Sequence, residues 1–515
     1  MSQDFLRIES YRKGVFYSTT FNALAKSIGF VNNLAVAFYF GAQANTDVYF
    51  YSLATILAVT GFLTNLNSAV LIPESMRLRI QRGAEESMSF VNLFLLAYCC
   101  VGIAIGGVVM ADPVGLYTVF SRFDSTILRS NLIILQFSAP LFFLVLITSF
   151  LNDVLTSLKF FTVPMIAGAM NSAICLVSIV SLQGSLGTTS IVIGMTCGYA
   201  SQMLLQLILM KWLLGWSFKT KLPGLSRRLA KNIMFAQTGN FATILSGYVP
   251  MFLFSGFSSG VIAALNYGQK VVDVPTALFT VQLSAVVGIK LNEHFAKGET
   301  DSFSHAFTRT GRIMMLFLVP LSVTIFLFSD DVVTILFRRG AFDKSAVALT
   351  SIFLRYLILL LPLYAINTLV ARVFMASQKI KEAFRYQVFM NVLLICGVVL
   401  GVRQYGVLGY PIALLSIYSL NVFFLQYLLR RYFPSLPYRQ VSVPLLIFAV
   451  VSGILGYFAL QIREMLGDIG IVTQLALMAA TYLCCFSLGI RFLLPREYLG
   501  QIRALLGKGV EGRVS

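Results

Sequence analysis

Charged residues are scarce in this sequence: Asp, Glu, Lys and Arg together make up only 12% of its 515 residues. A soluble domain of ordinary composition has about 25% charged residues, so this scarcity argues against a soluble globular protein. Hydrophobic residues reach 57%, and long apolar runs recur from one end to the other. Only helices or closed barrels satisfy the backbone in lipid, and the alternating segments typical of barrel strands are missing. The sequence therefore predicts an all-α polytopic membrane protein.

Histidine is almost missing as well, with only His294 and His305 in the chain. The seven cysteines lie in apolar segments without metal-ligand spacing, and we interpret them as small packing residues. The sequence has no Gly-Lys-Ser/Thr loop of the kind that cradles a nucleotide phosphate. We therefore expect a transporter rather than an enzyme, with no catalytic residues, metal or cofactor. A monovalent cation is the candidate coupling ion.

The net charge of +18 would suggest nucleic-acid binding in a soluble protein. Here the basic residues fall mainly in short loops between apolar runs, so membrane topology explains them and we expect no nucleic-acid partner. Loops rich in Lys and Arg follow every second span, and the positive-inside rule then places both termini in the cytoplasm. Fourteen spans of sufficient length are predicted, at 14–40, 47–72, 88–110, 130–156, 161–182, 188–214, 232–255, 261–290, 309–329, 347–375, 385–402, 406–429, 442–461 and 471–494.

Two similar segments, Arg82–Ser89 and Lys297–Ser304, lie 215 residues apart (297 − 82 = 215). Gly41 and Gly256 match at the same offset. Six spans separate the copies, which predicts a parallel pseudo-twofold repeat of two six-helix bundles followed by two C-terminal helices. The predicted domains are an N-terminal bundle at 1–215, a basic cytoplasmic linker at 216–231, a C-terminal bundle at 232–430, two extra transmembrane helices at 440–495 and a basic cytoplasmic tail at 496–515.

The stretch Asn266–Pro275 is polar although it lies inside a long apolar span. Read as a helix, Asn266, Lys270 and Asp273 share one face. A charge at the bilayer centre costs about 2.5 kcal/mol or more, so such residues normally face a cavity or a partner. This face is therefore predicted to line a polar cavity, although a purely structural pair of Lys270 with Asp273 stays an alternative.

Polar faces recur in three further spans that the repeat makes equivalent. Two lysines with little acid nearby indicate an anionic ligand, whereas the amides and threonines can also serve as hydrogen bonds between helices. Arg355 and Arg372 are weaker candidates because long basic side chains can extend to the membrane interface. Prolines 73, 275 and 362 are expected to kink their helices. The recurring polar residues are Asn22, Lys26, Asn32 and Asn33 in the first span, Thr60, Thr64 and Asn67 in the second, and Gln237 and Asn240 in the seventh.

Three stretches resemble the MurJ/MviN lipid II flippase family of the MOP exporter superfamily. Phe40–Phe50 is similar to its Phe-Gly-Ala…Thr-Asp-Ala-Phe stretch, and Asn266–Pro275 to its Tyr-Tyr-Ala-Asp-Arg…Glu-Phe-Pro stretch. Leu336–Asp343 is similar to its Leu-Phe-x-x-Gly-x-Phe segment. The resemblance implies a two-lobed, alternating-access exporter whose cationic cavity takes the diphosphate and sugar headgroup of lipid II. It also implies that the last two helices help to form a groove for the polyprenyl tail.

By position, Lys26 and Lys270 stand where the family has arginines, and Asp47 matches its acid at the start of the second span. Asn32 replaces a second arginine of the family, and the region around Ala58 and Val59 lacks an arginine pair. These departures leave a related undecaprenyl-linked oligosaccharide open as the substrate. The candidate substrate-binding residues are Lys26, Asn32, Asn33, Asp47, Asn67, Asn266, Lys270, Asp273 and Arg372.

We therefore predict a multi-pass protein of the bacterial cell (inner) membrane that moves a polyprenyl-diphosphate-linked saccharide to the outer leaflet by alternating access. Lipid II is the first candidate substrate, and membrane lipid is the other expected partner. Two further alternatives are a MATE-like multidrug or cation antiporter and a non-transporting scaffold of envelope assembly. The antiporter would require acidic cavity residues, and few are present.

Overall fold

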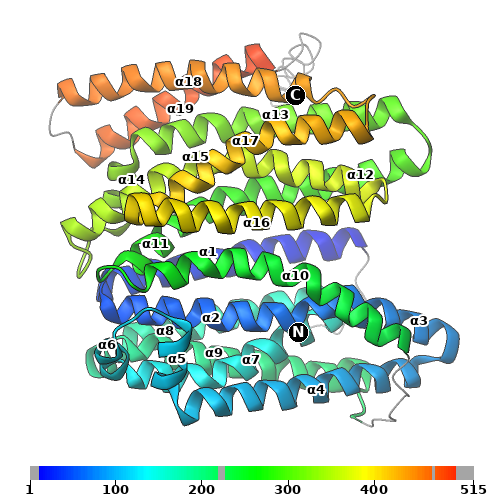
Figure 1. Cartoon of the computed structure of the whole chain (residues 1–515). Helices are drawn as coiled ribbons and strands as arrows, with labels where there is room; N and C mark the ends of the chain where they lie inside the picture. Colours follow the sequence, from blue (N-terminus) through cyan, green and yellow to red (C-terminus); the bar gives the residue numbers. More distant parts are fainter. Residues whose placement is uncertain (1–10, 219–226, 467–469, 494–515) are drawn as a thin grey trace, which may run out of the picture. The chain divides into compact units, whose positions relative to one another are not determined.

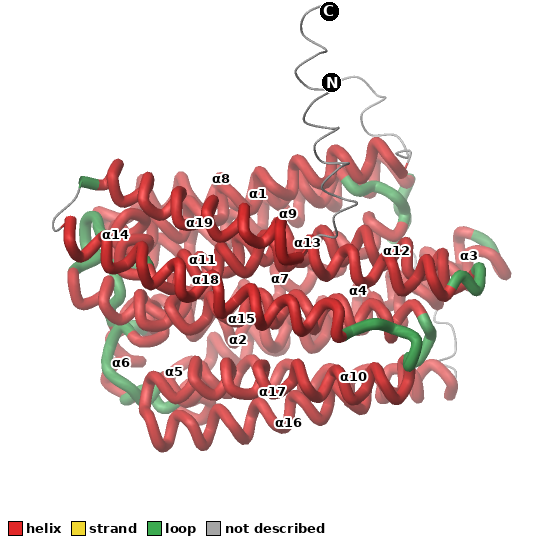
Figure 2. Tube along the Cα trace, turned by 90° about the horizontal axis from the view of Figure 1, so that it is seen from above, coloured by secondary structure: helices red, strands yellow, loops and turns green. Residues whose placement is uncertain are grey.

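The computed structural model describes residues 11–218, 227–466 and 470–493, and all regular elements in these ranges are helical (Figures 1 and 2). Eleven helical stretches of the described chain are long and apolar enough to cross a membrane, and one of them, Lys381–Tyr432, contains two of the predicted spans. Two shorter apolar helices, Leu24–Phe40 and Asn240–Phe254, coincide with the first and seventh predicted spans. The polytopic helical fold is thus confirmed, while the count of fourteen crossings stays a prediction.

The chain forms two compact units. The first extends to Asn266 and also includes Arg339–Ala346, and the second comprises Tyr267–Arg338 and the chain from Val347 onward. The seventh predicted span belongs to the first unit because its helix packs against the second span. The compact units are defined by contacts between helices, whereas the predicted repeat is defined by similarity between two parts of the sequence. The boundaries proposed from the repeat therefore stay a prediction, and half of the predicted linker (219–226) and all of the tail lie outside the described residues.

The first unit is organised around a buried helix, α7, which packs against α2, α4 and α9 (Figure 1). Its apolar residues form one core with neighbouring aromatic side chains, including Phe150 and Tyr98. A second contact joins α1 to α8, and α10 packs along α2. The helices of this unit are α1 (Tyr11–Phe40), α2 (Ala44–Leu66), α3 (Ile72–Arg82), α4 (Ala84–Ala111), α5 (Pro113–Phe120), α6 (Ser125–Ser130), α7 (Leu132–Ser157), α8 (Thr162–Leu186), α9 (Thr189–Leu214) and α10 (Arg227–Phe254).

The second unit places α13 against α12, α18 and α19, and pairs α16 with α17. Helix α15 is largely buried, with Leu357 and Leu361 among its enclosed side chains. Helix α11 begins in the first unit and continues into the second. The helices are α11 (Val261–Pro275), α12 (Gln282–Ala296), α13 (Thr300–Leu327), α14 (Ser329–Phe337), α15 (Lys344–Ala376), α16 (Ile380–Tyr405), α17 (Gly409–Tyr432), α18 (Arg439–Leu466) and α19 (Ile471–Leu493).

The second and eighth predicted spans share an unusual feature. Each contains a π-helical segment, Asn67–Leu71 after α2 and Thr276–Val281 after α11. Pro73 and Pro275 lie next to these segments, whereas α15 remains one α-helix through Pro362. The hairpin turns that follow also agree, because Gly83 and Gly298 both have positive φ and are 215 residues apart (298 − 83 = 215). These shared features support the predicted repeat. The match of Gly41 with Gly256 does not support it, because Gly41 has positive φ and the glycine of positive φ in the second copy is Gly260.

Candidate functional site

The polar face predicted on the eighth span is present on α11. Lys270 Nζ lies 3.4 Å from Asp273 Oδ2, and the two side chains are 39% and 46% exposed. Gln269 Nε2 also donates to Asp273 Oδ1 at 3.1 Å, so this acid receives two donors from its own helix. Asn266 donates to the Ile262 carbonyl one turn earlier. The pairing foreseen for Lys270 and Asp273 therefore exists, and it leaves both side chains accessible.

The opposite face of α11 is packed. Tyr267 is fully buried and its ring lies 5.5 Å from that of Phe337. Gly268 brings the α11 backbone close to α15, where an added Cβ would lie 3.3 Å from the Leu354 nitrogen. Helix α11 is thus fixed by its apolar side and presents Lys270 on the accessible side. Because an ionic pair exposed to lipid is costly, this accessible side is suited to a water-filled path.

In the first unit, Lys26 is exposed on α1. Asn33 donates to the Gly29 carbonyl of its own helix at 2.7 Å. Asn32 donates from Nδ2 to the Ser172 carbonyl of α8 at 2.9 Å, and its buried Oδ1 has no hydrogen-bond partner within the described residues. Asn32 therefore connects two helices, whereas Lys26 is exposed. The side chain of Asn22 lies outside the described residues.

Asp47 occupies a different setting from the lysines. It is only 3% exposed, and its two carboxylate oxygens accept from the backbone nitrogens of Gly260 at 2.6 Å and Ala263 at 2.7 Å. Gly260 immediately precedes α11 and Ala263 lies in its first turn, where backbone N–H groups have no partner within the helix. The carboxylate also complements the positive end of the helix dipole. Asp47 thus caps a helix more than 200 residues away, a contact that its place at the start of α2 does not reveal.

Asn67 is also buried within a polar network. Its Nδ2 donates to Asp153 Oδ2 at 2.8 Å, and its Oδ1 accepts from the Tyr98 hydroxyl at 2.9 Å. This network joins α7 and α4 to the start of the first π-helical segment, a function for Tyr98 that the sequence did not suggest. Gln237 and Asn240 of α10 donate to backbone carbonyls of α2, at Gly61 and Phe62. In these positions the amides connect helices, which was the structural alternative for them.

A close backbone contact involves the Leu336–Asp343 segment of the family resemblance. Ala341 N donates to the Phe38 carbonyl at the end of α1 at 2.7 Å. A Cβ added at Gly340 would lie 2.2 Å from that same carbonyl oxygen, and one at Gly41 would lie 2.4 Å from the Ala341 oxygen. Both glycines have positive φ. The glycines of this segment therefore allow two stretches of backbone to meet at the turn between α1 and α2.

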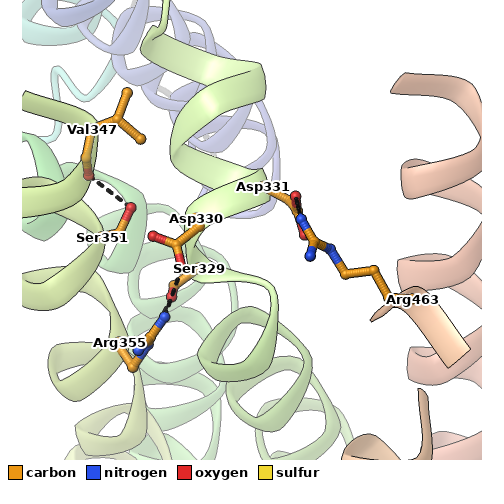
Figure 3. Close-up of polar contacts among 7 residues, drawn as sticks. All are labelled: Ser329, Asp330, Asp331, Val347, Ser351, Arg355 and Arg463. Atoms are coloured by element: carbon orange, nitrogen blue, oxygen red, sulfur yellow. Dashed lines mark hydrogen bonds and ion pairs between the residues drawn. The ribbon is translucent and has the colours of Figure 1, made fainter. Parts of the chain in front are cut away.

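The arginines of α15 lie in contrasting surroundings. Arg355 donates to Ser329 Oγ at 3.0 Å and to Asp330 Oδ2 at 2.7 Å (Figure 3). Arg372 is half-buried, and its methylene chain lies against the backbone of Gly288 on α12. The structure thus assigns Arg355 to a contact with the start of α14, while Arg372 stays a candidate for the substrate path.

One ion pair of the second unit was not foreseen. Arg463 of α18 binds both carboxylate oxygens of Asp331, at 2.7 and 2.6 Å, and the Asp331 side chain is only 8% exposed (Figure 3). An acid next to an apolar helix needs a partner, but the sequence does not say that the partner lies 132 residues later.

An apolar cavity of about 880 Å³ lies within the first unit, between α2, α4, α5 and α10. Ala58 and Val59, which replace the arginine pair of the family resemblance, are among its lining residues. The hydroxyl of Tyr248 also lines it and contacts the hydroxyls of Tyr51 and Thr55 at 2.7 and 3.1 Å. This part of α2 therefore presents an apolar surface where the resemblance would imply a cationic one.

By class, the described chain is an all-helical polytopic membrane protein with accessible ionic side chains in apolar spans. The family profile described as "MurJ: Lipid II flippase MurJ" matches residues 36–484. The chain therefore belongs to the MurJ family. A curated relative, "Probable lipid II flippase MurJ" of Borreliella burgdorferi, is 24% identical over 408 residues, which cover 76% of this chain and 77% of the relative.

Solved structures of other membrane proteins share this fold. The structure of "Lipid II flippase MurJ, inward closed conformation" superposes with a TM-score of 0.75 at 18% identity, covering 92% of this chain and 98% of that one. An inward-facing multidrug resistance MATE family transporter of the MOP superfamily gives a TM-score of 0.60 at 14% identity and covers 79% and 94%. At these identities the structural likeness describes the fold alone.

Proposed function

We propose that this protein is a flippase that moves lipid II from the inner to the outer leaflet of a bacterial cell membrane. Membership of the MurJ family across residues 36–484 is the observation that carries this proposal. The protein is then a transporter and not an enzyme, with both termini in the cytoplasm. Its partners are the lipid-linked saccharide and the surrounding lipid, and a monovalent cation is the proposed coupling ion.

Lys26 and Lys270 are each proposed to bind an anionic group of the substrate. Each is accessible within an apolar segment, and each belongs to a different compact unit. An ammonium group binds phosphate as a point charge through three donors. Asp273 holds Lys270 in place before the substrate arrives, and the anionic group then competes with that carboxylate. Asn33, Asn266 and Arg372 are proposed to complete the path, whereas Asp47, Asn32 and Asn67 support it through their contacts with neighbouring helices.

Complementation of a lipid II flippase depletion strain tests this function. We expect rescue by the wild type and by Lys26→Arg and Lys270→Arg, which keep the charge, and loss of rescue by Lys26→Ala and Lys270→Ala. Arg82→Ala is the matched control, because Arg82 is an exposed basic residue paired with the exposed Glu86. Failure of the well-expressed wild type would reject lipid II as the substrate. Rescue by both alanine variants would reject the proposed site.

A second candidate substrate is a different undecaprenyl-linked oligosaccharide. The apolar residues Ala58 and Val59 are the departure from the family pattern that motivates testing it. The two substrates can be separated with purified protein in proteoliposomes that contain one labelled lipid-linked saccharide at a time. Transport of the other saccharide without transport of lipid II would select this alternative.

A further inference from the structure

The two histidines of the chain lie around one cavity of the second unit. The cavity has a volume of about 740 Å³ and lies between α12 and α13. Its lining includes Lys290 and His294 on α12, and His305 and Arg309 on α13. On each helix the two residues are four positions apart, so each pair occupies one helical face. Two basic pairs from neighbouring helices therefore border the same cavity.

The lining changes from apolar to basic along the helices. Leu283, Val286 and Val287 belong to the part of α12 that lies further from the turn, and Ile313 belongs to the corresponding part of α13. Lys290 and the residues after it lie closer to the turn. A ligand that matched this gradient would have a hydrocarbon portion along the helices and an anionic group near the turn.

The net positive charge of the residues that line the cavity suits a ligand with a single negative charge. Lys290 and Arg309 contribute two positive charges, and Asp301 contributes one negative charge to the same lining. His294 Nδ1 lies 2.7 Å from Glu299 Oε2, so that carboxylate has a partner beside the cavity. Ser302 and Thr310 add hydroxyl groups to the lining. A phosphodiester carries one negative charge and accepts hydrogen bonds from ammonium, guanidinium and hydroxyl groups.

The apolar part of the lining favours a lipid as the source of the phosphodiester. Val286 is 57% exposed and belongs to an apolar span, so this part of the cavity offers a hydrocarbon chain an accessible apolar wall. The cavity volume falls within the usual range for ligand pockets, roughly 300–1,000 Å³, and so can hold a headgroup with part of one chain. We propose that this cavity binds the phosphodiester and one acyl chain of an anionic glycerophospholipid from the surrounding membrane. None of the residues that line this cavity is among the proposed substrate-binding residues.

Native mass spectrometry of the full-length protein in detergent tests the proposal, with dioctanoyl phosphatidylglycerol and phosphatidylcholine as probes. We expect the wild type to prefer phosphatidylglycerol, and Lys290→Gln/Arg309→Gln to lower its affinity about tenfold through loss of two charge-assisted contacts. Arg79→Gln/Arg82→Gln is the matched control, since it removes two exposed positive charges from the equivalent hairpin of the first unit. An equal loss in the control, or no loss in the cavity variant, would overturn the proposal.

A second variant examines the apolar wall without a change of charge. Val286→Trp fills the cavity and should also lower phosphatidylglycerol binding several-fold while the protein keeps its thermal unfolding temperature. Unchanged binding would show that no chain occupies the wall and would overturn the proposal. Undecaprenyl diphosphate and inorganic phosphate serve as competing probes. If the Lys290→Gln/Arg309→Gln variant loses only undecaprenyl diphosphate, or if inorganic phosphate competes as strongly as the lipid, the assignment to a glycerophospholipid is wrong.

Discussion

Two helical hairpins at corresponding positions of the repeat differ in what lies between their helices. In the first, α3 and α4, Phe90 and Phe94 belong to the apolar core. Adding 215 to these numbers gives His305 and Arg309, which border the cavity between α12 and α13. The hairpins share a glycine of positive φ at the turn, yet at these positions one contributes aromatic rings to a core that includes α7, and the other lines an open, basic cavity. A common backbone thus supports a packed core in one unit and a candidate ligand site in the other.

The largest expected effect separates the two hairpins by stability. Phe94→Ala should lower the free energy of unfolding by about 3 kcal/mol, because Phe94 is 8% exposed and packs against Phe90 at a ring distance of 5.1 Å. Arg309→Ala, at the corresponding position, should change it by less than about 0.5 kcal/mol because Arg309 is exposed. Thermal unfolding of both variants in the same detergent measures the difference. Equal effects would mean that the second hairpin is packed as the first is.

The polar network beside the first hairpin should respond less strongly. Asn67→Ala removes the partner of both Asp153 and Tyr98, and we expect a loss of about 2 kcal/mol. A double-mutant cycle with Asp153→Ala measures the interaction of the two residues directly. A coupling energy near zero would show that Asn67 is free to serve the substrate instead.

Two adjacent acids of the second unit, Asp330 and Asp331, are each paired with an arginine, and the two pairs should differ in their contribution to stability. Arg463→Ala leaves the enclosed Asp331 without its two-point partner and should cost about 2 kcal/mol. Arg355→Ala breaks a pair with the exposed Asp330 and should cost less than about 1 kcal/mol. Both acids lie in the first turn of α14 (Figure 3). The reverse order in thermal unfolding would contradict the assignment of Asp331–Arg463 as the stabilising contact.

A substitution that copies the first hairpin onto the second should have a modest effect. His305→Phe places an aromatic ring where the first hairpin has Phe90, and we expect a gain of up to about 1 kcal/mol if the ring enters the cavity. Phosphatidylglycerol binding should fall at the same time. Higher stability with unchanged lipid binding would show that the ring lies outside the cavity.

The smallest effect concerns the start of α15. Asp343 accepts from the Ala346 nitrogen and from Ser345 Oγ, both at 2.8 Å, and these bonds hold the pKa of its carboxyl below the ordinary value. A lowered pKa stabilises the folded protein above the unfolded value, and this stability is lost as the pH falls through the folded value. Asp343→Ala should therefore cost about 0.5–1 kcal/mol at neutral pH and less below pH ~4. Unfolding measured at both pH values checks the sign.

Much of the fold was predictable because membrane helices satisfy their own backbone and must be long and apolar. The same rule identified the accessible face of Lys270 and Asp273, since charged residues in such helices are rare. Family membership was also predictable, from three short stretches that resemble the family pattern. The positions of the lysines on their helices follow from periodicity alone.

The tertiary structure alone decided what the buried polar residues contact. Asp47, Asn67 and Asp331 each bind a partner on another helix, and those partners are set by packing between segments that are distant in the chain. It also decided that one hairpin is filled and the other open, because a hairpin's interior depends on how side chains from both helices meet. Periodicity describes a single helix, whereas a cavity or a buried ion pair belongs to at least two.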